Sequence, residues 1–228
     1  FFLVFGAKLL DELFVRHILL VMATAAILGG SMFAFVQLNL KRRLAYSSVA
    51  QIGYIFLGIG LDSRIGLAAA ILHIFNHAVM KTCLFLAAGA ILRQTGEKQV
   101  NRLAGIGYKM PLTMGAFTIA AFSMVGLPLF NGFISKWYLA LASLETGMPI
   151  FIGLLVLSGL LNATYFLPVV WQAFFVVDER EAKTFSLDKI PYPMSITLVV
   201  LAATIIYFGV NPSYPLELAT KAANTFLP

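Results

Sequence analysis

The stretch Gly126-Leu-Pro-Leu-Phe-Asn-Gly-Phe-Ile-Ser-Lys136 interrupts a long apolar segment and decides how the chain folds. That segment runs from about 111 to 144, beyond the roughly 20 residues that cross a bilayer as one helix. Pro128 removes a backbone donor, and the flanking glycines loosen the helix around it. The spacing therefore predicts one helix that is broken near Pro128, with Gly126 and Gly132 on either side of the break.

Apolar blocks of similar length lie on both sides of this stretch. The chain is 60% hydrophobic and 11% charged, whereas average usage is roughly half apolar and about a quarter charged. This composition excludes a soluble globular domain and predicts an all-α bundle of about six transmembrane helices. We expect a single transmembrane domain over 1–228, with helices over 15–40, 44–61, 65–92, 111–144, 149–177 and 192–210 and a surface tail over 211–228.

Basic residues alternate between the two ends of these helices. One side collects Lys41, Arg42, Arg43, Arg93, Lys98, Arg102, Lys109, Arg180, Lys183 and Lys189, and the other Lys8, Arg16, Arg64 and Lys221. Because Lys and Arg concentrate in cytoplasmic loops, we expect loops 41–43, 93–110 and 178–190 in the cytoplasm and the chain in the cell inner (plasma) membrane. The pI of about 9.5 thus reflects topology in a lipid bilayer, and we expect no nucleic-acid partner.

Cofactor sites are not expected from the residue types present. Cys83 is the single cysteine, so the chain cannot build a disulfide, a cysteine-ligated metal site or an iron–sulfur cluster by itself. The chain opens at Phe1 without an initiator Met, which favours a fragment of a longer sequence.

Lys81 lies near the middle of the third segment, preceded at four-residue spacing by His73 and His77. An ammonium at that depth costs from about 3 to more than 10 kcal/mol, so it needs a reason. On a helix the three side chains share one face. Because neutral imidazole accepts at one nitrogen and donates from the other, they form a plausible ladder for proton transfer.

Two other interpretations of this ladder stay open. The histidines and the lysine can simply hydrogen-bond to neighbouring helices and hold the bundle together. Histidines in helices also bind haem, but His73 and His77 project from one side of one helix and cannot bind opposite faces of one haem.

Lys136 directly follows the break, with Asn131 inside it. Broken membrane helices are tolerated where their freed backbone groups line a polar cavity, so Lys136 is expected within reach of water and ions. The alternative is an ammonium that extends to the interface beside Trp137. All ten acidic residues fall in loops or near helix ends. Lys81 and Lys136 are therefore expected to lose protons readily or to pair with acids from another segment or chain.

A weaker polar pattern occurs in the second segment. Ser47, Gln51 and Tyr54 recur at i, i+4 and i+7 and form a polar stripe on a helix, which is typical of ordinary interhelical packing. Asn162 and Tyr165 in the fifth segment are interpreted in the same way.

Three runs together resemble a known family. They are Lys41-Arg-Arg-Leu-Ala-Tyr-Ser-Ser-Val-Ala-Gln-Ile-Gly-Tyr54, His73-Ile-Phe-Asn-His-Ala-Val-Met-Lys-Thr-Cys-Leu-Phe-Leu86 and the stretch from Gly126 to Lys136. In this order they resemble the antiporter-like membrane subunits of respiratory complex I, of Mrp-type sodium/proton antiporters and of energy-converting membrane-bound hydrogenases.

The resemblance implies a fold of about fourteen helices with two inverted five-helix repeats, each containing one broken helix. Lys136 matches the lysine of the second broken helix, while His73, His77 and Lys81 match the central polar axis. Lys41 matches a further basic position near the cytoplasm. The chain matches only the second repeat and one helix after it, so we expect a partner that supplies the first repeat and an acid for Lys81 or Lys136.

The leading hypothesis is a proton- or Na⁺-translocating subunit of a redox-driven complex, of the NADH:quinone oxidoreductase or membrane-bound hydrogenase type, or of an Mrp-type antiporter. On this hypothesis the chain itself is expected to bind no flavin, quinone headgroup or cluster and to hold no catalytic redox residue. Its pathway comprises Lys136, Lys81, His77, His73 and Lys41, supported at the broken helix by Gly126, Pro128, Asn131 and Gly132. The alternative is a non-conducting structural subunit that seals or anchors such a complex. A self-sufficient transporter of an organic solute is disfavoured by the missing repeat.

Overall fold

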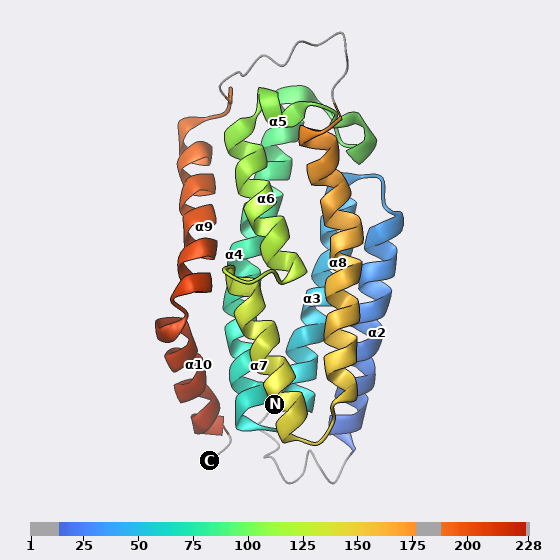
Figure 1. Ribbon diagram of the computed structural model, residues 1–228, viewed down its shortest axis with the longest axis vertical. Coiled ribbons are helices and arrows are strands. Elements are labelled where there is room, and N and C mark those ends of the chain that lie inside the picture. The colour runs from blue at the N-terminus through green and yellow to red at the C-terminus, as the bar shows by residue number, and fades with distance from the viewer. Residues whose placement is uncertain (1–13, 177–187, 227–228) are drawn as a thin grey trace.

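The computed structural model describes residues 14–176 and 188–226 and is helical throughout that part of the chain, apart from short turns (Figure 1). The predicted all-α bundle is therefore confirmed. In chain order its elements are α2 (Val15–Val36), α3 (Leu40–Gly60), α4 (Arg64–Thr95), η1 (Val100–Arg102), α5 (Ile106–Lys109), α6 (Pro111–Val125), α7 (Asn131–Glu145), α8 (Ile150–Phe174), α9 (Tyr192–Val210) and α10 (Ser213–Phe226).

The long helices run side by side along the long axis of the molecule, with α4 at the centre (Figure 1). Helix α4 packs against α3, α6, α7, α9 and α10, while α8 packs against α2, α6 and α7. Among the described helices, α2, α4, α8 and α9 are each long and apolar enough to cross a membrane. Helix α3 is more polar, and α6 and α7 follow one another along a single column.

The predicted break near Pro128 is confirmed, since α6 ends at Val125 and α7 begins at Asn131. Gly126 turns the chain out of α6 with φ +95°, and Leu129 in the connection has φ +75°. A positive φ strains any residue with a Cβ, so the break holds one strained residue that the surrounding contacts keep in place.

Two close backbone contacts fix this break. A Cβ on Gly132 would lie 2.2 Å from the carbonyl oxygen of Ser123 in α6. A Cβ on Gly209, at the end of α9, would lie 2.2 Å from the carbonyl oxygen of Leu129. The α9 column is itself interrupted after Val210. Both interruptions therefore meet at one level of the bundle (Figure 1).

The prediction of one helix over 15–40 is wrong at its end. Helix α2 ends at Val36, and Asn39 is extended and accepts a hydrogen bond from the Arg42 backbone N–H as the cap of α3. An Asn side chain in this role favours a new helix start. Residues 41–43, predicted as a loop, therefore form the first turn of α3. The segment 93–110 contains the end of α4, η1 and α5, whereas 177–187 lie outside the described residues.

Arg43, expected at the surface with its neighbours, is instead buried at 6% exposure. Its Nε donates to the carbonyl of Gln37 at 2.9 Å, and Nη1 donates to the carbonyl of Tyr165 in α8 at 2.9 Å. The acceptor on α8 lies three residues before Pro168, which lacks a backbone N–H and weakens the helix around it. Arg43 thus ties the turn between α2 and α3 to the part of α8 beside Pro168.

Replacing Arg43 by Met is expected to lower the free energy of unfolding by about 3 kcal/mol, because two charge-assisted hydrogen bonds disappear from a buried place. Thermal unfolding of the detergent-solubilised full-length protein, followed by far-UV circular dichroism, measures the change. The exposed neighbour Arg42 gives a matched control, and Arg42→Met is expected to stay within about 0.5 kcal/mol of the parent. Equal melting of both variants would contradict this role of Arg43.

The C-terminal part, predicted as a surface tail, forms the helix α10 and packs along α4. Pro212 and Pro215 lie at the start of this helix, where proline is compatible with the first turn. Pro215, Ala219 and Ala223 are buried on one side of α10, and the exposed side carries the ion pair between Lys221 and Glu217. Residues 213–226 therefore form an amphipathic helix that packs on α4.

Candidate functional site

Lys136 projects from the second turn of α7 back toward the end of α6. Its Nζ donates to the carbonyl of Met124 at 2.6 Å and to that of Val125 at 3.1 Å. These carbonyls close α6, where unpaired C=O groups and the helix dipole favour a cation. The ammonium also lies 5.2 Å from the ring centroid of Tyr54, a favourable cation–π distance. The side chain crosses directly over Gly126, so the break provides the space as well as the acceptors.

Lys81 occupies the middle of the bundle and is 6% exposed. Its Nζ donates to the carbonyl of Leu44 at 2.8 Å and to the hydroxyl oxygen of Ser47 at 2.5 Å, both in α3. Ser47 itself donates to the Leu44 carbonyl at 2.9 Å. The ammonium is therefore held by one backbone and one side-chain oxygen of the neighbouring helix.

Carboxylates do not contact either lysine within residues 14–176 and 188–226. The acidic partner expected from the sequence is thus not supplied by this part of the chain. Neutral oxygen dipoles surround both ammonium groups instead. Such surroundings compensate a buried charge only partly, which suits groups that change their protonation state.

His73 and His77, both on α4, lie between Lys81 of the same helix and Lys136 of α7. His73 Nδ1 is 2.8 Å from the hydroxyl oxygen of Ser135, the residue that precedes Lys136. The rings of His73 and His77 are nearly parallel, with centroids 6.1 Å apart. Tyr54 meets the His73 ring edge-on at 5.2 Å. His73 therefore joins α4 to the beginning of α7, and His77 lies one turn nearer to Lys81.

Asn131 stabilises the start of α7 from inside the break. Its backbone carbonyl accepts from Asn76 Nδ2 at 2.8 Å, and its Oδ1 accepts from the Ser123 hydroxyl at 2.8 Å. The Gly132 N–H donates to that same hydroxyl at 2.9 Å. These bonds connect α4, α6 and α7 around the break. Pro128 is exposed in the connecting loop.

Several buried polar atoms of this region lack a hydrogen-bond partner among the described residues: His73 Nε2, His77 Nε2, Asn76 Oδ1, Asn131 Nδ2 and both amide atoms of Gln51. An unsatisfied buried group costs about 1–3 kcal/mol, and native structures rarely leave such groups unpaired. Ordered water satisfies such groups where the surroundings are polar. These atoms lie in the region of Lys81 and Lys136, and groups of this kind are the ones to which ordered water binds.

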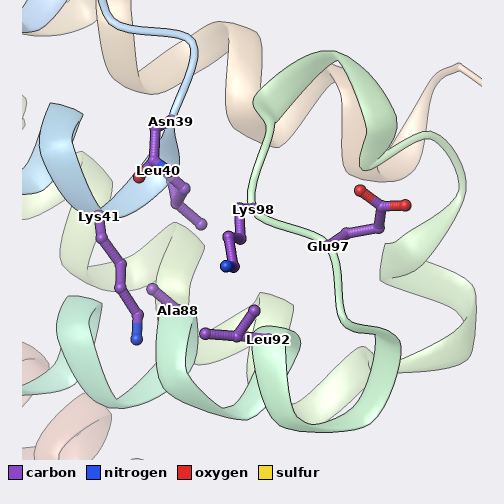
Figure 2. A pocket seen from close by; sticks show the side chains of 7 residues that line it. All are labelled: Asn39, Leu40, Lys41, Ala88, Leu92, Glu97 and Lys98. Carbon is purple, nitrogen blue, oxygen red and sulfur yellow. The ribbon is translucent and has the colours of Figure 1, made fainter.

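Lys41 lies apart from this cluster, at the N-terminal end of α3. It lines a cavity of about 230 Å³ together with Asn39, Leu40, Ala88, Leu92, Glu97 and Lys98. Figure 2 shows Lys41 and Lys98 reaching the cavity from two different segments, with the Glu97 carboxylate turned away from both. Glu97 instead lies 4.0 Å from Arg102. The structure thus places Lys41 at the end of the bundle where basic residues gather, and not beside Lys81.

Helix α8 contributes neighbours of Lys136 that the sequence indicated only as ordinary packing residues. Asn162 Nδ2 donates at 2.9 Å to the Met124 carbonyl, the acceptor that also binds Lys136. The Tyr165 hydroxyl donates to Asn162 Oδ1. The hydroxyls of Tyr54 and Ser158 are 2.6 Å apart. The sequence shows that these polar residues lie on one helix. Their proximity to Lys136 depends on how three helices pack together, which the sequence does not show.

Comparisons with known proteins agree with this architecture. A family model described as NADH:quinone oxidoreductase/Mrp antiporter, transmembrane, matches residues 1–162. NADH-quinone oxidoreductase subunit N of Desulforudis audaxviator is 44% identical over 199 residues, which are 82% of this chain and 40% of that protein.

Solved structures show the same arrangement of helices. One chain of the membrane-bound sulfane sulfur reductase, an archaeal respiratory membrane complex, superposes with a TM-score of 0.85 at 32% identity, over 99% of this chain and 45% of that one. A chain of the Mrp complex from Dietzia sp. DQ12-45-1b gives a TM-score of 0.84 at 25% identity, over 92% and 47%. This chain therefore spans less than half the length of each of these three relatives.

Proposed function

This chain belongs to the transmembrane family of NADH:quinone oxidoreductase and Mrp antiporter subunits, and from that premise we propose that it carries protons through the membrane. We place it in an ion-translocating subunit of a redox-driven complex, or of an Mrp-type cation/proton antiporter. Its named relatives are a subunit of an NADH-quinone oxidoreductase and chains of a respiratory complex and of an Mrp complex.

One observation carries this proposal. Lys81 and Lys136 are held inside the bundle by neutral oxygens, with His73 and His77 between them. A protein that needed only to pack its helices gains nothing from two ammonium groups at this depth. The two ammonium groups are explained if they bind and release protons along a path.

The ion that passes these residues is proposed to be the proton rather than Na⁺. Hard cations bind to sets of several oxygen ligands, often carboxylates. Among the residues that the structure describes, no such carboxylate approaches Lys81 or Lys136, and two ammonium groups repel a metal cation. Ammonium and imidazole groups, in contrast, exchange protons directly.

The orientation and the partners follow as parts of the same proposal. The end that carries Lys41 and Lys98 faces the cytoplasm, because basic residues concentrate there. Lys41 then lies where protons enter or leave this half of the pathway. A further membrane segment or subunit supplies the first repeat of the family and an acid that acts on Lys81 or Lys136.

A Lys81→Met variant of the full-length subunit, in its assembled complex, tests the proposal. Proton translocation into proteoliposomes is expected to fall about tenfold, equal to about 1.4 kcal/mol of added barrier, while the amount of assembled complex stays constant. The pH gradient is followed by quenching of an amine dye. Unchanged translocation, together with a dry surround of Lys81 in the assembled complex, would favour the structural subunit instead.

A further inference from the structure

We propose that Gln51 of α3 is a positioning residue that holds water on the path between Lys81 and Lys136. This inference rests on the proposed function and adds a residue to it. Gln51 was interpreted from the sequence as part of an ordinary packing stripe. Its surroundings in the structure do not fit that interpretation.

The Gln51 side chain is fully buried, at 0% exposure. Neither its Nε2 nor its Oε1 forms a hydrogen bond of normal distance and angle in the described part of the chain, although the amide lies near the Tyr54 hydroxyl. A packing glutamine inside a membrane bundle normally bonds across to the next helix, because an amide left alone there is unfavourable. An amide offers two donors and an acceptor, so it is well suited to bind water from both of its ends.

The position of Gln51 follows from two contacts between the antiparallel helices α3 and α4. Lys81 binds Ser47 at one level, and His73 contacts Tyr54 at another. Gln51 lies between Ser47 and Tyr54 on α3, as His77 lies between Lys81 and His73 on α4. Gln51 and His77 therefore occupy the same level of the bundle.

His77 carries the matching unsatisfied atom, since its buried Nε2 also lacks a partner among residues 14–176 and 188–226. An amide and an imidazole nitrogen at one level, both without partners, give a water molecule the polar contacts that it needs. The residues above and below are already engaged, because Ser47 binds Lys81 and Tyr54 contacts His73 and Lys136. Water bound by Gln51 would connect the Lys81 level with the His73 and Lys136 level.

The chemistry requires no ionisation of Gln51. The water accepts a proton on its oxygen from the Lys81 side and gives up another proton toward His73 or Lys136, so it ends as water again. The amide orients the water through its N–H and C=O groups and remains unchanged. An apolar side chain of similar size offers no such contacts to water.

The experiment compares Gln51→Leu, Gln51→Asn and Lys81→Met in the full-length subunit within its assembled complex. Gln51→Leu is expected to reduce proton translocation about tenfold and to increase the ratio of rates in H₂O and D₂O, because proton transfer across the dry gap becomes limiting. Gln51→Asn, which keeps an amide, is expected to restore most of the rate. The melting temperatures of Gln51→Leu and Gln51→Asn are expected to equal that of the parent.

The outcomes separate the two proposals. If Lys81→Met lowers translocation and Gln51→Leu does not, Gln51 holds no essential water and the inference is wrong, while the proposed function stands. If neither variant lowers translocation, the proposed function is wrong. If Gln51→Leu fails to fold, a high-resolution structure of the parent complex decides: water bonded to the Gln51 amide supports the inference, and a direct protein partner on both amide atoms overturns it.

Discussion

A Lys136→Met variant of the full-length subunit is expected to assemble like the parent and to translocate protons about 100-fold more slowly, the lower end of the contribution of a positioned proton-transfer group. Methionine is unbranched and only one atom shorter than lysine, so it can fill most of the space over Gly126 and against Tyr54. It cannot bind a proton or complement the carbonyls of Met124 and Val125. The pH gradient formed by reconstituted complex measures the loss.

Two further variants separate charge from proton exchange at this place. Lys136→Arg keeps a cation on the end of α6, but guanidinium does not deprotonate in proteins, so it is expected to preserve assembly and still block translocation. Lys98→Met removes an exposed cation and is expected to leave the rate unchanged. A Lys136→Arg variant with the parental rate would show that only the charge is needed.

The second large effect is expected from Gly132→Ala. The added Cβ would meet the Ser123 carbonyl oxygen at 2.2 Å, so α6 and α7 must separate. The Cβ is fixed to the α7 backbone and the carbonyl is part of the α6 backbone, so neither can rotate away. The expected loss of stability is therefore at the upper end for an overpacked site, about 3 kcal/mol. The hydrogen bond from the Gly132 N–H to the Ser123 hydroxyl weakens as well. We expect a lower melting temperature of the solubilised protein and loss of most proton translocation.

Gly115 in α6 is the matched control, since no described atom lies within 4 Å of the Cβ that alanine would add. Gly115→Ala is expected to raise the free energy of unfolding by roughly 0.5–1 kcal/mol, because alanine is the better helix residue. Similar melting temperatures for the two variants would mean that the break tolerates a wider spacing, and the role assigned to Gly132 would then be wrong.

The helical fold and the break could be predicted because they depend on local rules. Pro128 with two flanking glycines ends a helix whatever surrounds it. The four-residue spacing of His73, His77 and Lys81 likewise places them on one face of any helix. These features belong to single segments, so one sequence is enough to find them.

The partners of the two lysines could not be predicted in the same way. Lys136 binds backbone carbonyls, which every residue carries, so no residue type marks the acceptor. The contact of Lys81 with Ser47 depends on the register between α3 and α4. Arg43 was predicted in a loop because it follows two other basic residues, whereas its donors reach two carbonyls inside the bundle.

The end of α9 restricts how the helices around the break can move. Gly209 lies so close to the Leu129 carbonyl that α9 cannot slide inward without displacing the connection between α6 and α7. The outer side of α9 exposes Val199, Val200 and Ile206, which form an apolar surface. Any displacement of α9 toward the bundle would therefore have to move the segment that lies in the chain between Lys136 and its carbonyl acceptors at the end of α6.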